Sequence, residues 1–189
     1  MEREDILQRI QAFAQRVNHR KVSGLVVHCT ANAEGVDIGA KEIKRFHVQE
    51  RGWVDIGYHF VIRIDGTIEP GRYLNKAGAH VSGHNATTIG ICFVGGLEAA
   101  IDSRGRIVAK KNSRGREIPK DTRTPEQKES LRWLLTQLAR ALPSVRTIKG
   151  HRDYSPDLNG NGVIEPREFI KSCPCFDAIP EYRDILENR

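Results

Sequence analysis

The chain of 189 residues is long enough for one domain with a sizeable hydrophobic core. Charged residues make up 29% and hydrophobic residues 39%, which excludes an intrinsically disordered chain, and no apolar run approaches the roughly 20 residues of a membrane-spanning helix. The formal net charge of +6 favours a polyanionic partner such as nucleic acid, anionic lipid or cell wall, although the basic residues are spread along the chain.

The N-terminal segment, residues 1–21, is charged throughout and lacks the apolar stretch of a secretory signal. The sequence therefore predicts synthesis in the cytoplasm without a signal peptide, and a separate release step if the protein works outside the inner membrane. Four cysteines in a cytosolic chain are typical of thiols or metal ligands rather than disulfides. Cys29 and Cys92 lie within apolar runs and are expected in the core.

The first part of the chain is predicted to alternate helix and strand. Apolar residues at helical spacing predict an amphipathic helix over residues 3–18, within an N-terminal helical extension of residues 1–22. Residues 24–30 (GLVVHCT) form a short continuous apolar run, which is typical of a buried central strand. A helix is expected over residues 38–50, with Asp37 as its N-cap.

Further strands are predicted in the middle of the chain. Residues 57–64 and 67–69 are joined by Asp-Gly, a strong hairpin signal. A loop rich in small and polar residues leads to a buried strand over residues 89–94. Residues 98–123 are polar and basic, and they are predicted as a solvated loop or loose hairpin, with a patch for cell wall or nucleic acid as the alternative.

The last third of the chain begins with a clear helix signal. Residues 124–127 (TPEQ) match a capping box with proline at the first helical position, and leucines on one face continue the helix to Pro143. A short strand is expected over residues 145–148 and a final helix over residues 179–186. The alternation predicts an α/β fold, a single domain over residues 23–189 with a central mixed β-sheet flanked by helices.

Three separated residues form a candidate metal site. His151 and Cys173 lie near the C-terminus, and His28 lies near the end of the first buried strand. Zinc takes imidazole nitrogen and thiolate in tetrahedral geometry, and catalytic sites use three protein ligands and leave the fourth position to water. Two neutral imidazoles and one thiolate leave a net charge of about +1, which keeps the metal a Lewis acid. The residues thus predict one zinc ion, with a satisfied core histidine as the alternative for His28.

Several motifs over residues 23–178 follow the order of one enzyme family. They are 27–31 (VHCTA), 52–60 (GWVDIGYHF), 78–80 (GAH), 85–96 ending in IGICFVGG, 150–153 (GHRD) and 171–177 (KSCPCFD). The chain thereby resembles the phage-lysozyme branch of the zinc-dependent N-acetylmuramoyl-L-alanine amidases, relatives of the peptidoglycan recognition proteins. The resemblance implies their fold, zinc on His28, His151 and Cys173, and peptidoglycan as partner. Cys175 could also bind metal, but Cys173 is the cysteine that matches the motif.

The resemblance also implies which residues act on the substrate. The reaction is hydrolysis of the amide between the muramic acid lactyl group and L-alanine, with catalytic roles for Tyr58 and Lys171. Lys171 stands two residues before a predicted ligand, where its ammonium can stabilise the charge of a tetrahedral intermediate. Tyr58 is placed beside the metal and can bind water or the developing oxyanion. His80 and Asn85 lie in the loop that borders the family's substrate groove and are expected to contact substrate.

Three functions are compatible with these motifs. The first is a phage or prophage endolysin, a monomer that acts on the cell wall after release and needs neither nucleic acid nor a membrane. The second is a cytoplasmic muropeptide-recycling amidase, in which a carboxylate usually replaces the third ligand, so Cys173 favours the lytic type. The third is a non-catalytic protein that binds peptidoglycan or regulates a partner, and such proteins tend to lose the thiolate ligand or the catalytic pair.

The connection between the last two predicted ligands is longer than is usual in the family, and residues 153–170 form an insertion. Part of this insertion matches an EF-hand calcium loop, with Gly162 at the sharp turn. The residues at ligand positions are Asp157, Asn159, Asn161 and Glu168. No clear helix precedes this loop, and an Asn/Gly turn before a short helix near Pro166 is the alternative. The pattern favours a structural calcium ion over that alternative.

Overall fold

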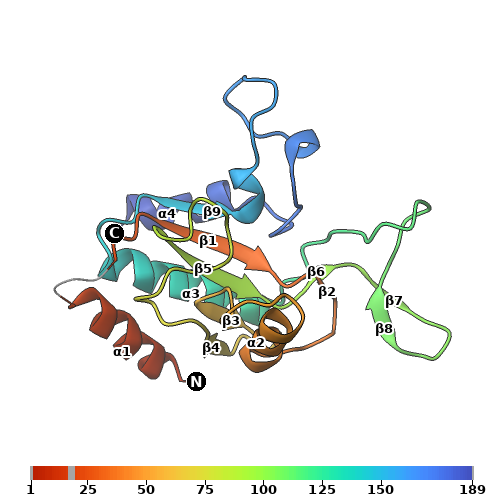
Figure 1. Cartoon of the computed structure of the whole chain (residues 1–189), viewed down its shortest axis with the longest axis horizontal. Helices are drawn as coiled ribbons and strands as arrows, with labels where there is room; N and C mark the ends of the chain where they lie inside the picture. The colour runs from red at the N-terminus through yellow and green to blue at the C-terminus, as the bar shows by residue number, and fades with distance from the viewer. Residues whose placement is uncertain (1, 17–19, 189) are drawn as a thin grey trace.

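A computed structural model describes residues 2–16 and 20–188, and its centre is a five-stranded mixed sheet (Figure 1). The strand order is β4-β3-β5-β1-β9, in which β4 alone pairs antiparallel, at one edge. The strands are β1 (Gly24–Cys29), β3 (Phe60–Ile62), β4 (Ile68–Pro70), β5 (Thr88–Phe93) and β9 (Thr147–Gly150). Two small pairs complete the strands: β2 (Asn32–Ala33) with β6 (Gly96–Leu97), and β7 (Ala99–Ile101) with β8 (Ile107–Ala109).

Helices cover both faces of this sheet. They are α1 (Arg3–Ala14), α2 (Ala40–Gln49), α3 (Pro125–Ala141) and α4 (Ala178–Glu187), with short 3-10 helices η1 (His151–Tyr154) and η2 (Pro166–Glu168) between β9 and α4. Side chains of α1, α3 and α4 share the main core with the sheet, and α2 packs on the opposite face through Ile43. The predicted fold, one α/β domain with a central mixed sheet flanked by helices, is confirmed. None of the helices among the described residues has the length and apolar character needed to cross a bilayer.

The alternation of side chains along β1 separates core residues on one face of the sheet from His28 on the other. Leu25, Val27 and Cys29 are buried in the main core beneath the helices. Because successive side chains of a strand point to opposite faces, His28 points to the other side. The same alternation in β5 places Gly90 and Cys92 on this second face, and Cys92 is the residue that pairs with His28.

Element boundaries differ from the sequence prediction at several ends. The helix predicted over residues 3–18 ends at Ala14, and positions 17–19 lie outside the described residues. The strand predicted over residues 57–64 shortens to β3. The capping box before α3 is confirmed, because the Gln127 N–H donates to the Thr124 hydroxyl at 3.1 Å.

The predicted N-cap of α2 is wrong. The helix begins after Gly39, whose N–H donates to the Glu42 carboxylate at 2.9 Å. Asp37 accepts instead from the Arg63 guanidinium at 2.5 Å and from the Ile64 N–H at 3.3 Å. The Arg63 guanidinium, 26 residues away in sequence, thus occupies the carboxylate that was expected to cap the helix. Local sequence spacing does not reveal such a distant partner.

The basic stretch forms a hairpin arm, here defined as residues 98–120, that projects from the body of the domain beyond β6 (Figure 1). Strands β7 and β8 pair antiparallel and form its stem. The chain then returns through a second turn, which is closed by an isolated bridge between Lys111 and Glu117. The prediction of a loose hairpin is confirmed.

A buried guanidinium ties α4 to the segment that leads into α3. The side chain of Arg123 is only 2% exposed and donates to Asp121 at 2.8 Å and to Glu181 at 2.7 Å. It also contacts the Tyr182 hydroxyl at 2.8 Å and lies over the Phe176 ring. Because Phe176 follows closely after the predicted ligand cysteine, this cluster fixes the segment that carries the site.

Replacement of Arg123 by methionine should lower the free energy of unfolding by about 2–3 kcal/mol. This is less than the roughly 3–5 kcal/mol of a fully buried pair, since both carboxylates are partly exposed. A urea titration followed by circular dichroism measures the loss. Arg132→Met is the matched control, because the exposed Arg132–Asp184 pair also joins α3 to α4 and should contribute at most about 1 kcal/mol.

The same cluster predicts a pH dependence of stability. Burial alone would raise the pKa values of Asp121 and Glu181, but the hydrogen bonds and charge of Arg123 outweigh burial and lower both. A lowered carboxylate pKa contributes stability above the unfolded value of about 4, and this stability is lost as the pH falls through the folded value. The difference in unfolding free energy between wild type and Arg123→Met should therefore shrink below about pH 4. An unchanged difference at pH 3 would contradict this account.

Candidate metal centre and substrate cavity

The three residues predicted to bind zinc come together at one edge of the sheet. The potential ligand atoms of His28, His151 and Cys173 all lie within 4.8 Å of one another. His28 Nδ1 is 3.8 Å from Cys173 Sγ, and the two imidazole centroids are 4.8 Å apart. In the described part of the chain, these residues form the one such cluster of histidine, cysteine and carboxylate ligands.

Parallel strand pairing explains why distant residues meet here. Val27 of β1 pairs with Gly150 of β9, so the residues that follow, His28 and His151, lie side by side at the carboxyl ends of the two strands. The segment with Cys173 is held against this edge, because the Arg152 N–H donates to the Cys173 carbonyl at 2.8 Å. The ring of Pro174, the residue after Cys173, packs directly on Gly150. A Cβ atom at position 150 would come within 2.4 Å of this ring, so the contact requires glycine.

Both imidazoles favour the neutral form that a metal ligand needs. Burial, with the charges of His80, His151 and Lys171, lowers the pKa of His28 well below its ordinary value. Burial and the nearby Lys171 lower the pKa of His151 to about 4. Zinc bonds of about 2.3 Å to sulfur and 2.0 Å to nitrogen, at a tetrahedral angle, place the two donor atoms roughly 3.5 Å apart. The observed donor types and their 3.8 Å spacing therefore fit a zinc ion.

His80 orients His28, a role that sequence analysis missed. Its Nδ1 lies 3.1 Å from His28 Nε2, so the His28 nitrogen that faces away from Cys173 has a partner. The chain of contacts continues from His80 Nε2 to the Thr88 hydroxyl at 3.5 Å, and this hydroxyl donates to a backbone carbonyl at 2.8 Å. Partners of this kind fix the tautomer and orientation of a ligating histidine. The sequence signal was Gly90 in a buried strand, where a Cβ would lie 2.6 Å from the His80 ring.

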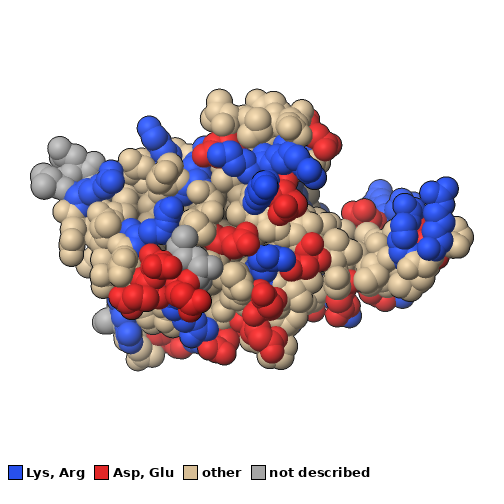
Figure 2. Space-filling view, turned by 90° about the horizontal axis from the view of Figure 1, so that it is seen from below, with Lys and Arg blue, Asp and Glu red and all other residues tan. Residues whose placement is uncertain are grey.

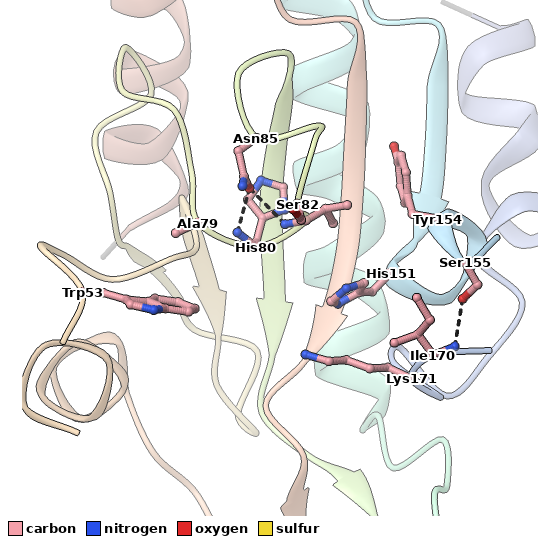
Figure 3. Close-up of a pocket in the computed structure, with 11 residues that line it drawn as sticks. Trp53, Ala79, His80, Ser82, Asn85, His151, Tyr154, Ser155, Ile170 and Lys171 are labelled. Atoms are coloured by element: carbon pink, nitrogen blue, oxygen red, sulfur yellow. Dashed lines mark hydrogen bonds between the residues drawn. The ribbon is translucent and has the colours of Figure 1, made fainter. Parts of the chain in front are cut away.

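The two predicted catalytic residues flank the cluster. The ring of Tyr58 is half-buried, 5.1 Å from that of His28, and desolvation raises the pKa of Tyr58 well above its ordinary value. The phenol therefore keeps its proton at neutral pH and can donate a hydrogen bond. Lys171 is exposed, and its side chain extends beneath the His151 ring towards the open space before the cluster (Figure 3).

An open cavity of about 600 Å3, the His80 cavity, adjoins the cluster through His151 (Figure 3). The residues that line it include Trp53, His80, Asn85, His151, Tyr154 and Lys171. Asn85 also shapes the wall, since its side-chain oxygen accepts from the backbone N–H groups of His80 at 2.7 Å and of Val81 at 2.9 Å. Both predicted substrate-binding residues thus border the cavity, where their contact with substrate stays a prediction.

Comparison with known proteins places this site in a family. Residues 18–166 match the family model of the N-acetylmuramoyl-L-alanine amidases. The endolysin of Enterobacteria phage K11 is 36% identical over 166 residues, which cover 88% of this chain and 89% of that protein. The endolysin of Escherichia phage T7 is also 36% identical, over 87% of this chain and 86% of its own length.

The chain belongs to the N-acetylmuramoyl-L-alanine amidase family. Among solved structures, the amidase LysC from Clostridium intestinale URNW superposes with a TM-score of 0.57 at 26% identity, over 92% of this chain and 89% of its own. Drosophila PGRP-LB superposes with a TM-score of 0.53 at 20% identity, over 88% of this chain and 84% of its own, which shows a shared fold. The resemblance inferred from the motifs is confirmed.

The second cysteine of the amidase's KSCPCFD motif faces away from the cluster. Cys175 Sγ lies 3.3 Å from the Gly96 carbonyl oxygen and 3.8 Å from Cys29 Sγ. Cys29 is buried in the core, as predicted, and so is Cys92. The geometry favours Cys173 over Cys175 as the ligand, in agreement with the motif.

The structure does not support the calcium prediction in the amidase's insertion. Glu168 is buried, and its carboxylate accepts from the backbone N–H groups of Leu158 at 2.9 Å and Glu165 at 2.8 Å. The carboxylate of Asp157 accepts from two glycine N–H groups at 2.7 Å. Backbone amides thus bind the oxygens that were expected to need a cation. The observed arrangement is the alternative, a turn that includes Asn159 and Asn161 before the short helix η2.

Proposed function

We propose that this amidase hydrolyses peptidoglycan at the amide between the lactyl group of N-acetylmuramic acid and L-alanine, as a zinc-dependent endolysin. The observation that carries the proposal is the cluster of His28, His151 and Cys173, of which His151 also lines an open cavity. Zinc in such a three-ligand site supplies Lewis acidity and lowers the pKa of water towards about 7. The endolysins of phages K11 and T7 support the assignment to cell-wall lysis.

The chain's own residues have distinct roles in this proposal. His28 is oriented by His80 and keeps its Nδ1 free to bind metal. Lys171 brings an ammonium group to the cavity, where negative charge develops on the oxygen of the attacked carbonyl. Tyr58, whose ring lies 5.1 Å from that of His28, would donate a hydrogen bond from its phenol to the same developing charge. Neither residue needs to change its protonation state to stabilise that charge.

The unit that performs the reaction is residues 23–189, and the N-terminal extension packs α1 against α3. In the proposal, the protein acts as a monomer on the wall after release from the cytoplasm. A muropeptide-recycling amidase and a non-catalytic binding protein are less well supported. The thiolate ligand and both predicted catalytic residues are all present, and the ligand cysteine lies within reach of both histidines.

A digest of purified peptidoglycan tests the proposal directly. The protein should release new L-alanine amino termini, measured by amino-terminal labelling, without new reducing sugar ends. New reducing ends alone would identify a glycosidase and contradict the proposal. Binding to the wall without either product would identify a recognition protein.

A further inference from the structure

The arm contains the same five-residue turn twice. Residues 102–106 (DSRGR) and 112–116 (NSRGR) are ten positions apart. In each, the first side chain accepts backbone N–H bonds from both arginines, at 2.8 and 2.9 Å in the first turn and at 2.9 and 3.1 Å in the second. The glycines, Gly105 and Gly115, have φ values of 74° and 71°. The two turns therefore have one backbone geometry.

The turns differ in charge at their first position. In the first turn, Asp102 forms an ion pair with Arg106 at 2.7 Å. In the second turn, the neutral Asn112 makes the same backbone contacts and leaves Arg116 without that partner. Within the described part of the chain the arm forms three ion pairs, and neither Lys111 nor Arg116 takes part in them. Figure 2 shows Lys and Arg gathered on the arm where it projects from the body.

The second turn also borders the metal centre. An open cavity of about 620 Å3, the Arg116 cavity, extends from Cys173 and Lys171 to Lys111 and Arg116. Lys171 lines both this cavity and the His80 cavity, so the two cavities share it as a border. The Arg116 cavity is lined by three cations, Lys111, Arg116 and Lys171, and by one carboxylate, Glu117.

We propose that the Arg116 cavity is a substrate subsite, in which Arg116 and Lys111 bind the free carboxylate on the second residue of the peptidoglycan stem peptide. The inference rests on the proposed function and adds a preference for acidic stem peptides. A planar guanidinium pairs with a carboxylate through two parallel hydrogen bonds, and such charge-assisted bonds are stronger than neutral ones. The peptide supplies the ligand because the N-acetylated sugar chain carries no charge, whereas stem peptides carry free carboxylates.

Two variants of the second turn test the subsite, and two of the first turn are matched controls. Arg116→Gln removes the cation, and Asn112→Asp copies the first turn and pairs Arg116 within the arm. Arg106→Gln makes the same change, and Asp102→Asn the reverse change, in the turn that lies outside the cavity. The substrates are two soluble muramyl peptides that differ only in a free or amidated carboxylate on the second residue.

Both variants of the second turn should raise KM for the acidic peptide about tenfold, with kcat unchanged. KM for the amidated peptide should stay constant, and both controls should match wild type on both peptides. Salt of about 0.5 M should weaken wild-type binding of the acidic peptide, because it screens exposed charges. An unchanged KM in Arg116→Gln, or an equal rise for both peptides, overturns the subsite.

Failure of the proposed function gives a different result. In that case wild type releases no L-alanine amino termini from either peptide. Calorimetric titration of the same peptides then still decides the subsite, since the dissociation constant of the acidic peptide should rise about tenfold in Arg116→Gln and Asn112→Asp. Equal affinity of wild type for the acidic and amidated peptides contradicts it.

Discussion

Replacement of Cys173 by serine should release the metal and abolish hydrolysis. The change removes the one thiolate of the cluster, whose sulfur lies 3.8 Å from His28 Nδ1. Changes to outer-shell partners alone cost about 10–100-fold in metal affinity, so the loss of a ligand should lower affinity by at least about 100-fold. Elemental analysis after dialysis gives the zinc content, and release of L-alanine termini gives the activity.

Cys175→Ser is the matched control for this experiment. It makes the same substitution two residues away, on a sulfur that faces the Gly96 carbonyl oxygen. This variant should keep one zinc ion per chain and its activity. If Cys175→Ser loses the metal and Cys173→Ser keeps it, the ligand has been misassigned. Full lytic activity of wild type after complete chelation would falsify zinc dependence.

The grouping of His28, His151 and Cys173 could be predicted from sequence because the positions of these residues follow simple rules. A histidine at the end of a buried parallel strand lies at the edge where ligands bind, and His151 follows a strand that ends at the same edge. The motifs around Cys173 then completed the set. The role of His80 was not predictable in this way, because its contact with His28 joins residues 52 positions apart through a loop.

The calcium prediction is not supported, for a local reason. The spacing of Asp157 and Glu168 fits a calcium loop, but the same spacing suits carboxylates that accept backbone N–H bonds. A sequence pattern shows which residues carry carboxylate or amide oxygens, but it does not show whether these oxygens bind a cation or backbone N–H groups. The Arg116 cavity is another feature that sequence could not reveal, since it is lined jointly by the second turn of the arm and by residues 171–175, which are far apart in the chain.

Replacement of Lys171 by alanine should lower kcat by about 100-fold or more and leave zinc content unchanged. Loss of one donor to a developing oxyanion typically costs this much. Lys171 is exposed and is not a ligand, so the variant should melt at the wild-type temperature. KM should change little, because the lost interaction acts mainly on charge that appears in the transition state.

A double-mutant cycle with Tyr58→Phe separates a shared role from two independent ones. If Lys171 and Tyr58 stabilise the same developing charge, removal of both should cost less than the product of the two single losses. Strictly multiplicative losses would show that the two residues act independently. Near wild-type turnover in Lys171→Ala would show that the ammonium beneath the His151 ring has no part in the reaction. Lys171 would then act only in substrate binding, at the border of the Arg116 cavity. KM values of Lys171→Ala for the acidic and amidated peptides would measure that role.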